Sequence, residues 1–405
     1  IRDLPDDESA VNPKNWADLS WEETQKGKKT IKELRKICKT INTVYLATDP
    51  DREGEAIAWH LFSDFSEKKL LNDKEVKRIT FNEITSSAIK QAINSPRKID
   101  QDLVDAYLAR RILDHLIGFK VSPLVWRHAP PAKSAGRVQS PSLRIICERE
   151  TERDKHIKEE YWPISSKFNY EDFIFDAELI KFNDEDLKKN PISAEIEVKE
   201  IESELNSKEF YIQSIETKPQ SSSPNPPFRT STLQMTASSI LGFTADRTMR
   251  AAQNLYEAGL ITYLRTDGIN ISTSPNTGEP FSEENPGPPP LQEIRNVITE
   301  KFGDKFLSDQ VRVYKSKVKN SQEAHEAIRP TNIKTFPENI NLGQDEQKLY
   351  TLIWNRTLSS QMSNSQHERK KIVVCSKDNK YAFNASSRKT LFKGFETLSK
   401  KDSSE

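Results

Sequence analysis

The spacing of hydrophobic residues changes along the first hundred positions. Each spacing predicts a different kind of element. The run TVYLAT at residues 43–48 is apolar or β-branched almost throughout and predicts a buried strand. In residues 54–65, apolar side chains recur every three or four positions, which predicts a helix. A second strand is predicted at 76–81, where the sequence reads VKRITF, followed by a helix that begins near Glu83. This alternation indicates an α/β layer that ends close to Pro96.

The pattern becomes helical after this layer and then sheet-like. Residues 99–158 are rich in Leu, Ile, Arg and Glu and predict two or three helices around an APPAKSAG loop. Residues 161–215 hold short runs of aromatic and β-branched side chains, which predict strands. The stretch QSSSPNPP at 220–227 is expected to break regular structure and to mark a boundary or hinge. Helices are predicted after it, with a Pro- and Gly-rich loop at 274–290 and, beyond Lys348, a helix followed by strands.

Composition limits the classes of protein to which this chain can belong. Hydrophobic residues make up 35% of the 405 positions and charged residues 30%, which is enough apolar material for several packed domains. No apolar run reaches the roughly 20 residues that a membrane helix needs, and no secretory pattern is seen, so a cytoplasmic protein is expected. The formal net charge is zero. Any contact with DNA must therefore be made by local groups rather than by bulk positive charge.

Three acidic residues, Asp49, Asp51 and Glu53, follow the first predicted strand with the spacing DxDxE. On an extended segment this spacing would place alternate side chains on one face. Carboxylates held that close repel one another, and a hard divalent cation such as Mg²⁺ relieves the repulsion. The pattern therefore predicts a magnesium site. A solvated acidic turn is the alternative interpretation of the same residues.

A candidate nucleophile occurs in the segment GLITYLRTDG, where Tyr263 is followed by Arg265 and Asp267 at intervals of two. On an extended stretch these three side chains would face the same way, so that a guanidinium could stabilise both a phenolate and a phosphate. That arrangement is typical of a phosphoryl-transfer site. The alternative is a buried tyrosine beside an exposed ion pair.

Longer sequence words around these residues resemble a known family. The segment ATDPDREGEAIAWHL resembles the acidic motif of the TOPRIM domain, which topoisomerases, primases and some nucleases share. PPFRTSTLQ, LYEAGLITYLRTDG and SQEAHEAIRPT occur in that order and resemble the active-site region of the type IA DNA topoisomerases, the bacterial topoisomerase I group in particular. The absence of a GxxxxGK[ST] loop is consistent with chemistry that needs no ATP.

The resemblance implies a role for each matched residue. Tyr263 would be the nucleophile that becomes linked to a 5′ phosphate, Arg265 would position the scissile phosphate, and Asp267 would help to organise the site. His325, in EAHEAIRP, matches a histidine that assists near that phosphate. Glu53 would act in catalysis as well as in holding Mg²⁺ with the other two acidic residues.

A helix with the sequence YLARRILDHLIGF resembles the segment of the family that contacts single-stranded DNA. Arg110 and Asp114 lie four residues apart in it, and a plain intrahelical salt bridge is the alternative explanation for this pair. Relatives often carry an arginine where this chain has His115, so the base preference at the cut is not implied. The resemblance implies contacts to the DNA strand for Arg78, Arg110, Arg111, Asp114, Arg137 and Gln139.

The family architecture is a multi-domain α/β and α+β fold, arranged as a torus of four domains. The resemblance divides the chain into a partial TOPRIM domain (1–97), a helical DNA-binding domain (98–158), a sheet-rich arch (159–222 and 350–392), a helical domain with Tyr263 (223–349) and the start of a return into the helical DNA-binding domain (393–405). The family's first strand carries a Glu and a Lys that this chain does not contain, so the chain is interpreted as a fragment.

The implied function is ATP-independent relaxation of negatively supercoiled DNA by cutting, passing and rejoining single strands. The implied protein is a bacterial, nucleoid-associated monomer. Three alternatives share part of the sequence pattern: a topoisomerase III-like decatenase, a TOPRIM nuclease or primase, and an inert DNA-binding fragment. A TOPRIM nuclease or primase would have no need of the YLRTD segment.

Overall fold

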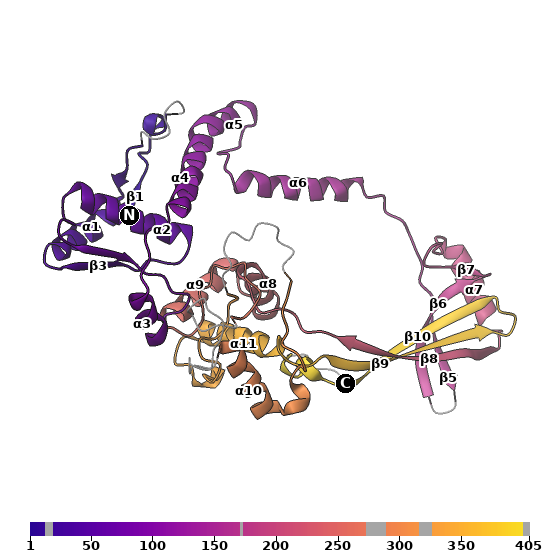
Figure 1. Cartoon of the computed structure of the whole chain (residues 1–405). Coiled ribbons are helices and arrows are strands. Elements are labelled where there is room, and N and C mark those ends of the chain that lie inside the picture. The colour runs from indigo at the N-terminus through magenta and orange to yellow at the C-terminus, as the bar shows by residue number, and fades with distance from the viewer. Residues whose placement is uncertain (13–18, 171–172, 273–288, 316–325, 400–405) are drawn as a thin grey trace. The chain divides into compact units, whose positions relative to one another are not determined.

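Figure 1 shows a computed structural model of the chain, which describes residues 1–12, 19–170, 173–272, 289–315 and 326–399. The backbone divides into two compact units. The first unit contains residues 1–155 and 256–263, and the second contains most of the remaining described residues. Each unit is described by itself.

The first unit is built on a β-α-β crossover. Strand β3 (Thr43–Leu46) pairs in parallel with β4 (Glu75–Arg78), and helix α2 (Arg52–Glu67) connects the two. The apolar side of α2 packs on the strands because its hydrophobic residues recur every three or four positions. The core that results contains Cys38, Leu46, Ala58, Leu61 and Phe65. The predicted order of strand, acidic loop, helix and strand is therefore confirmed.

Helices surround this crossover. The other elements of the first unit are β1 (Arg2–Asp3), η1 (Glu8–Ala10), β2 (Glu22–Glu23), α1 (Gln25–Cys38), α3 (Ser86–Asn94), α4 (Gln101–Leu116), the π-helical turn η2 (Ile117–Val121), α5 (Ser122–His128) and α6 (Gln139–Lys155). Helix α4 packs against α2, and the side chain of Asp100 caps it by accepting from the N–H groups of Asp102 and Leu103. The helices predicted for residues 99–158 are present.

A buried histidine gives the first unit a measurable dependence on pH. His60 is surrounded by the rings of Trp21, Trp59 and Tyr107, and neither of its ring nitrogens has a hydrogen-bond partner among the described residues. Burial, reinforced by the nearby charge of Arg2, lowers the pKa of His60 to about 4. The unfolded chain therefore binds more protons than the folded chain between the ordinary histidine pKa and that value.

We expect the free energy of unfolding to be fully retained above the ordinary pKa of His60 and to fall by roughly 3 kcal/mol as the pH is lowered to about 4. Urea unfolding at a series of pH values measures this. The His60→Leu variant is the control, because it should remove that part of the slope whatever its stability at neutral pH. An unchanged slope in the variant would contradict the assignment.

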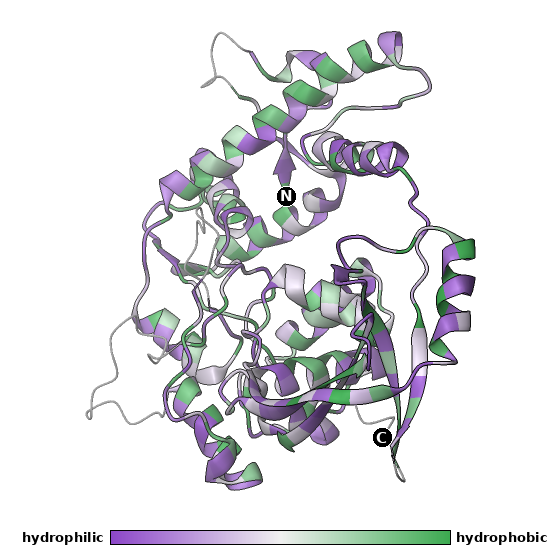
Figure 2. Ribbon diagram, turned by 90° about the vertical axis from the view of Figure 1, so that its right-hand side faces the viewer, coloured by the Kyte–Doolittle hydropathy of each residue, from purple (hydrophilic) through white to green (hydrophobic). Residues whose placement is uncertain are grey.

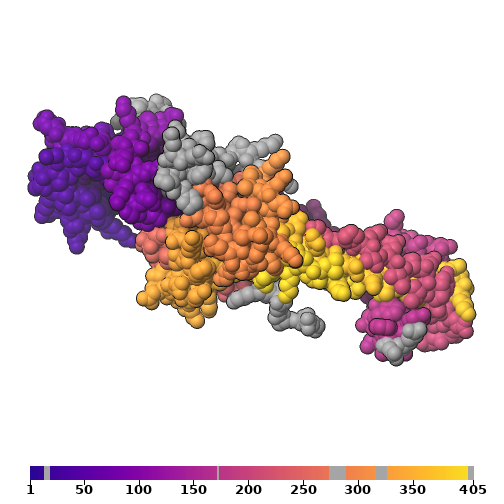
Figure 3. All heavy atoms as spheres, turned by 60° about the horizontal axis from the view of Figure 1, so that its bottom comes forward, coloured from indigo at the N-terminus to yellow at the C-terminus, as the bar shows by residue number. Residues whose placement is uncertain are grey.

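The second unit contains an antiparallel sheet with the strand order β5-β6-β10-β9-β8, and β7 adds to the side of β6. Its strands are β5 (Ser165–Tyr170), β6 (Phe173–Phe182), β7 (Glu185–Asp186), β8 (Phe210–Ser222), β9 (Ser365–Ser376) and β10 (Tyr381–Phe392). Strands from two distant stretches of sequence thus pair with each other, and in Figure 3 the yellow atoms of the C-terminal stretch lie against pink atoms from the middle of the chain. One sheet thus contains strands from both segments of the predicted arch, 159–222 and 350–392, whereas the domain division itself stays a prediction.

Two details of this unit differ from the sequence-based expectation. Strand β8 continues to Ser222 and includes Pro219, although a break was predicted from residue 220. Proline is tolerated there because β8 is an edge strand of the sheet. Helix α7 (Glu195–Leu205) lies inside the stretch predicted to form only strands, and it packs Ile201 into the core of the sheet. The helix predicted beyond Lys348 is present as α11 (Gln344–Ser359), and strands follow it as predicted.

The remaining helices of the second unit are α8 (Thr230–Leu241), α9 (Ala245–Glu257, whose last residues belong to the first unit), α10 (Pro290–Phe302), α11 (Gln344–Ser359), η3 (Asp304–Phe306), η4 (Pro337–Asn339) and η5 (Gly394–Leu398). Hydrophobic and hydrophilic residues alternate along the helices in Figure 2. Among the described residues, no helix is both long enough and apolar enough to cross a membrane.

Candidate active site

The acidic loop between β3 and α2 is shaped by a helix cap. Asp51 has extended backbone angles and is the N-cap of α2, where its Oδ1 accepts a hydrogen bond of 2.7 Å from the N–H of Gly54. Because the helix begins at Arg52, Glu53 lies in its first turn rather than on an extended segment. The predicted alternation of three carboxylates along one extended face is therefore wrong.

The consequence for metal binding is that the three carboxylates do not converge. Among the described residues, no group of three or more His, Cys, Asp or Glu side chains is close enough to form a metal site. Asp49 and Glu53 are exposed, and Asp51 is half-buried. The loop therefore offers an open set of hard oxygen ligands rather than a closed cage. Mg²⁺ is commonly held by one or two carboxylates together with water and phosphate oxygens.

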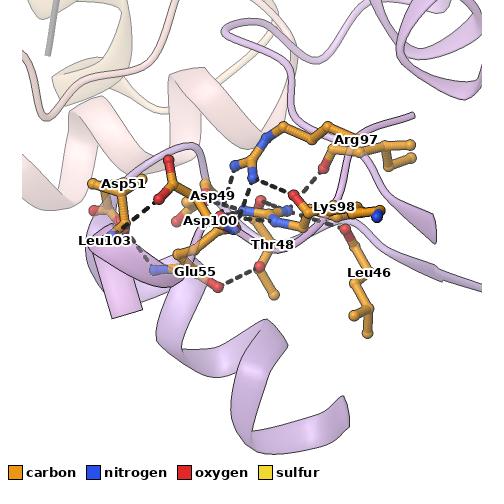
Figure 4. Close-up of polar contacts among 12 residues, drawn as sticks. Leu46, Thr48, Asp49, Asp51, Glu55, Arg97, Lys98, Asp100 and Leu103 are labelled. Atoms are coloured by element: carbon orange, nitrogen blue, oxygen red, sulfur yellow. Dashed lines mark hydrogen bonds and ion pairs between the residues drawn. The ribbon is translucent and has the colours of Figure 1, made fainter. Parts of the chain in front are cut away.

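A buried carboxylate lies behind the acidic loop. Glu55 accepts hydrogen bonds at Oε1 from Arg97 and from the N–H of Asp100, both at 2.7 Å, and at Oε2 from Arg97 at 2.7 Å and Arg78 at 3.0 Å (Figure 4). Burial alone would raise the pKa of Glu55, but the hydrogen bonds from Arg97 and Asp100 and the charge of Arg78 lower it. Because Asp100 caps α4, this single carboxylate joins α2, β4 and the start of α4.

Arg78 fixes the backbone that leads into the acidic loop. Its guanidinium donates to the carbonyl oxygens of Leu46 (3.0 Å), Thr48 (2.7 Å) and Asp49 (2.8 Å), in addition to the carboxylate of Glu55. The side chain is completely inaccessible to solvent. The predicted contact between Arg78 and DNA is therefore wrong for this structure, because every part of the guanidinium faces the protein interior. Arg78 positions the loop instead.

Gly54 allows this loop to close on itself. A Cβ atom at this position would lie 2.2 Å from the carbonyl oxygen of Asp49. We expect Gly54→Ala to push the acidic loop away from α2 and to cost about 1–3 kcal/mol of stability, as overpacking does elsewhere. Urea unfolding measures the stability, and Gly118→Ala is the control, since a Cβ there would meet no atom within 4 Å. Equal losses in the two variants would show that the Gly54 contact is not the cause.

The segment 256–263 brings a tyrosine to this loop. The hydroxyl of Tyr263 donates a hydrogen bond of 2.6 Å to Oδ2 of Asp51, and its backbone N–H donates to the carbonyl of Asn82 at 2.7 Å. Gly259 permits the approach, because it adopts a φ of 71° and its Cβ would lie 2.4 Å from the carbonyl oxygen of Ile84. The structure thus joins the predicted nucleophile and one residue of the predicted acidic cluster within the first unit.

A second tyrosine lies beside the first. The rings of Tyr256 and Tyr263 meet edge to face with centroids 5.4 Å apart. Tyr256 is only 2% exposed, and its hydroxyl has no hydrogen-bond partner among the described residues. Burial raises the pKa of Tyr256, and the charges of Asp49 and Asp51 raise it further. The Tyr256 phenol therefore stays protonated beside Tyr263.

The other predicted catalytic residues are not brought together in the same way. Arg265 and Asp267 are exposed members of the second unit, in an irregular segment, whereas Tyr263 is buried. The expectation that the three share one face of an extended strand therefore does not hold. His325 lies outside the described residues. Its neighbour Glu326 is described, and its carboxylate accepts from Arg329.

The residues predicted to contact a DNA strand lie on α4 and before α6. Asp114 accepts from Arg137 at 2.8 and 3.4 Å, which joins two sequence motifs that are 23 residues apart. The alternative pairing of Asp114 with Arg110 along α4 is not formed. Arg110 is half-buried, and no hydrogen bond or ion pair engages its side chain within the described part of the chain. Arg111 instead forms a two-point ion pair with Asp3, at 2.6 and 3.0 Å.

Gln139 occupies the first position of α6. Its amide donates to the hydroxyl of Ser134 at 2.9 Å, so it closes the loop in which Arg137 lies. This local contact orders the SAGRVQS segment. Whether DNA binds there stays a prediction.

Comparison with known proteins agrees with this geometry. A family model described as DNA topoisomerase matches residues 98–405, and a Toprim domain model matches residues 4–84. The chain belongs to the DNA topoisomerase family. The predicted family resemblance and the predicted combination of a TOPRIM domain with helical and sheet-rich parts are confirmed.

Individual topoisomerases resemble the chain along almost all of its length. DNA topoisomerase 1 of Rickettsia bellii is 44% identical over 407 residues, covering 98% of this chain and 49% of the relative. DNA topoisomerase 1 of Zymomonas mobilis is 41% identical over 398 residues, covering 98% of this chain and 31% of the relative. The solved structure of full-length topoisomerase I from Thermotoga maritima matches with a TM-score of 0.75 at 34% identity, covering 100% of this chain and 63% of that one. The chain thus spans half or less of the length of these two sequence relatives.

Several residues of this topoisomerase site were not predicted from the sequence. Glu55 and Arg97 form the ion pair behind the acidic loop, and Tyr256 lies against Tyr263. The sequence contains a signal for two of these three residues. Glu55 and Tyr256 fall within the motifs that carry the family resemblance, whereas nothing local distinguishes Arg97 from an ordinary surface arginine.

Proposed function

We propose that the protein cuts one strand of DNA by transesterification, with Tyr263 as the nucleophile, and rejoins it after another strand has passed. The observation that supports this most directly is the 2.6 Å hydrogen bond from the hydroxyl of Tyr263 to the carboxylate of Asp51. A phenol is a weak nucleophile at neutral pH because its ordinary pKa is near 10. A carboxylate in hydrogen-bond contact can accept its proton as the new bond forms.

In the proposed step, the oxygen of Tyr263 bonds to phosphorus while the bond from phosphorus to the 3′ oxygen breaks. The proton of the hydroxyl passes to Asp51, and the departing 3′ oxygen takes up a proton from the solvent to become a free hydroxyl. The phosphate stays linked to the protein through its 5′ side. Rejoining is the reverse reaction, so the phosphodiester energy is kept and no ATP is required. Relaxation of negative supercoils would follow.

Arg265 and the helix α4 have supporting roles in this proposal. Arg265 is exposed and follows the nucleophile by two residues, so its guanidinium can bind the scissile phosphate. Asp267 and His325 are proposed to assist there. Arg110, Arg111, Asp114, Arg137 and Gln139 are proposed to line the path of the single strand.

Magnesium is the cation that we propose for the acidic loop. Asp49 and Asp51 provide hard carboxylate oxygens whose charges act on the buried, unpartnered Tyr256, and Glu53 is exposed in the first turn of α2. We assign Asp49 and Asp51 as the principal ligands, with Glu53 as an accessory one. When bound, the cation would neutralise phosphate charge during rejoining. Arg78 and Glu55 keep the loop in position to receive it.

Covalent trapping tests the proposed function. The chain, and a longer form of the protein, are mixed with a single-stranded oligonucleotide labelled at its 3′ end and quenched with detergent. Labelled protein is expected, because a 5′-phosphotyrosyl bond leaves the 3′ fragment attached. An oligonucleotide labelled at its 5′ end should leave the protein unlabelled.

Other outcomes distinguish the alternatives. Cut DNA without labelled protein would indicate a nuclease and contradict the role of Tyr263. Labelling of the longer form alone would show that the residues described here form an incomplete enzyme. If no form cuts or binds the strand, the proposed function is wrong.

A further inference from the structure

A buried hydroxyl without a hydrogen-bond partner is rare in folded proteins, and Tyr256 provides one. The residue lies in the last turn of α9 and is almost completely inaccessible. Other buried tyrosines of this chain are satisfied. The hydroxyl of Tyr350, for example, donates to the carbonyl of Thr335 at 2.9 Å, and that of Tyr381 donates to Glu204 at 2.6 Å. The unpartnered hydroxyl of Tyr256 therefore needs its own explanation.

The surroundings of this hydroxyl are chemically specific. The Tyr256 ring packs edge to face on Tyr263, whose own hydroxyl is bound to Asp51. Asp49 and Asp51 are the two charged groups that act on the Tyr256 phenol. A neutral hydroxyl in a field set by two carboxylates is oriented to donate rather than to accept. The oxygens of Asp51 accept from Tyr263 and Gly54, and no group among the described residues accepts from Tyr256, so an acceptor for its hydroxyl has to come from a ligand.

We propose that Tyr256 is a positioning residue whose hydroxyl donates a hydrogen bond to an oxygen atom that enters the acidic loop with its ligand. Two sources share this chemistry: a water of hydrated Mg²⁺ and a phosphate oxygen of the DNA strand. The inference rests on the proposed function for the identity of these ligands. It does not require that Tyr263 reacts.

The substitution that tests this is Tyr256→Phe, which removes only the hydroxyl. Without ligand, the variant should have the same Tm as the unsubstituted chain or a higher one, because deleting an unsatisfied buried polar atom removes a desolvation cost. With ligand, affinity should fall by about tenfold, the effect expected when one hydrogen bond is lost.

Two titrations separate the sources of the oxygen. Binding of MgCl₂ alone is measured by calorimetry, and binding of a short single-stranded oligonucleotide in EDTA is measured by fluorescence anisotropy. Weaker binding of MgCl₂ alone identifies the water of the cation as the acceptor, and weaker binding of the oligonucleotide alone identifies the phosphate. Either result supports the proposal.

The matched control is Tyr350→Phe, which removes a buried hydroxyl that has a partner far from the acidic loop in sequence. It should lower Tm and leave both affinities unchanged. The proposal is overturned if Tyr256→Phe changes neither affinity, or if the variant without ligand is less stable, since the hydroxyl would then already have a partner. Both titrations are independent of strand cleavage, so failure here and failure of covalent trapping are distinct results.

Discussion

Replacing Tyr263 with phenylalanine is expected to abolish covalent attachment to DNA, lowering the rate of strand cleavage by about 10⁴-fold or more, as losses of a covalent nucleophile do in other enzymes. The hydroxyl is the only part removed, and the ring can keep its edge-to-face contact with Tyr256. The amount of labelled protein in a detergent-quenched reaction with a 3′-labelled oligonucleotide measures the effect.

The fold should survive this substitution. Asp51 loses one hydrogen bond but keeps the N–H of Gly54, and its half-buried carboxylate can be reached by water. The change in the free energy of unfolding is therefore expected to stay near 1 kcal/mol or below. Full labelling of the Phe variant would assign the nucleophile to another residue. Loss of labelling together with unfolding would leave the assignment without support, and circular dichroism distinguishes the two cases.

Replacing Glu55 with alanine is expected to give the largest loss of stability, about 3–5 kcal/mol, because it leaves the buried charge of Arg78 without its counterion. Arg97 is one-third exposed and can turn to solvent, but the Arg78 side chain has no exposed surface. The N–H of Asp100 also loses its acceptor. Urea unfolding of the first unit measures the loss.

A matched control for Glu55 is present on the same helix. Asp64 is also buried in α2, where it binds Arg35 and Lys68, but both of these cations retain contact with solvent. Asp64→Ala should therefore cost less stability than Glu55→Ala and should not alter binding of MgCl₂, since Asp64 makes no contact with the acidic loop. If the two variants lose equal stability, the burial of Arg78 is not the dominant cause.

Elements with a strong hydrophobic pattern could be predicted from the sequence. Strand β3 and helix α2 form one such case. The continuous apolar run of β3 favours a strand, the helical spacing of apolar residues in α2 favours a helix, and the two elements pack on each other. Strand β8 shows the limit of this approach. Pro219 and the serines after it oppose a strand locally, and only the position of β8 at the edge of the sheet makes them acceptable.

Helix α7 was missed for a related reason. Its sequence begins EIEV, which alternates like a strand, and its helical form depends on Ile201 packing against the sheet core. Such tertiary packing overrides a weak local preference in either direction. A short amphipathic segment between two strands is therefore the hardest kind of element to assign from sequence.

The sequence predicts which residues form the candidate site better than it predicts how those residues are arranged. Asp51 and Tyr263 were singled out, and they are in contact. The extended spacing assumed for the acidic cluster failed because Asp51 caps a helix, a competing role that aspartate favours. The family resemblance implies a DNA contact for Arg78, yet its complete burial, which the sequence does not show, makes it an internal support.

The hydrogen bonds that Asp51 accepts from Gly54 and Tyr263 also restrict which amino acids can occupy that position. The side chain must be short enough to cap α2 and must carry two acceptor oxygens, one for Gly54 and one for Tyr263. Asparagine offers one oxygen and a donor, serine offers a single oxygen, and glutamate carries an extra methylene that moves both oxygens away from the cap. None of these three substitutions at position 51 is therefore expected to be neutral. The helix and the tyrosine impose this constraint together, independently of any cation or DNA.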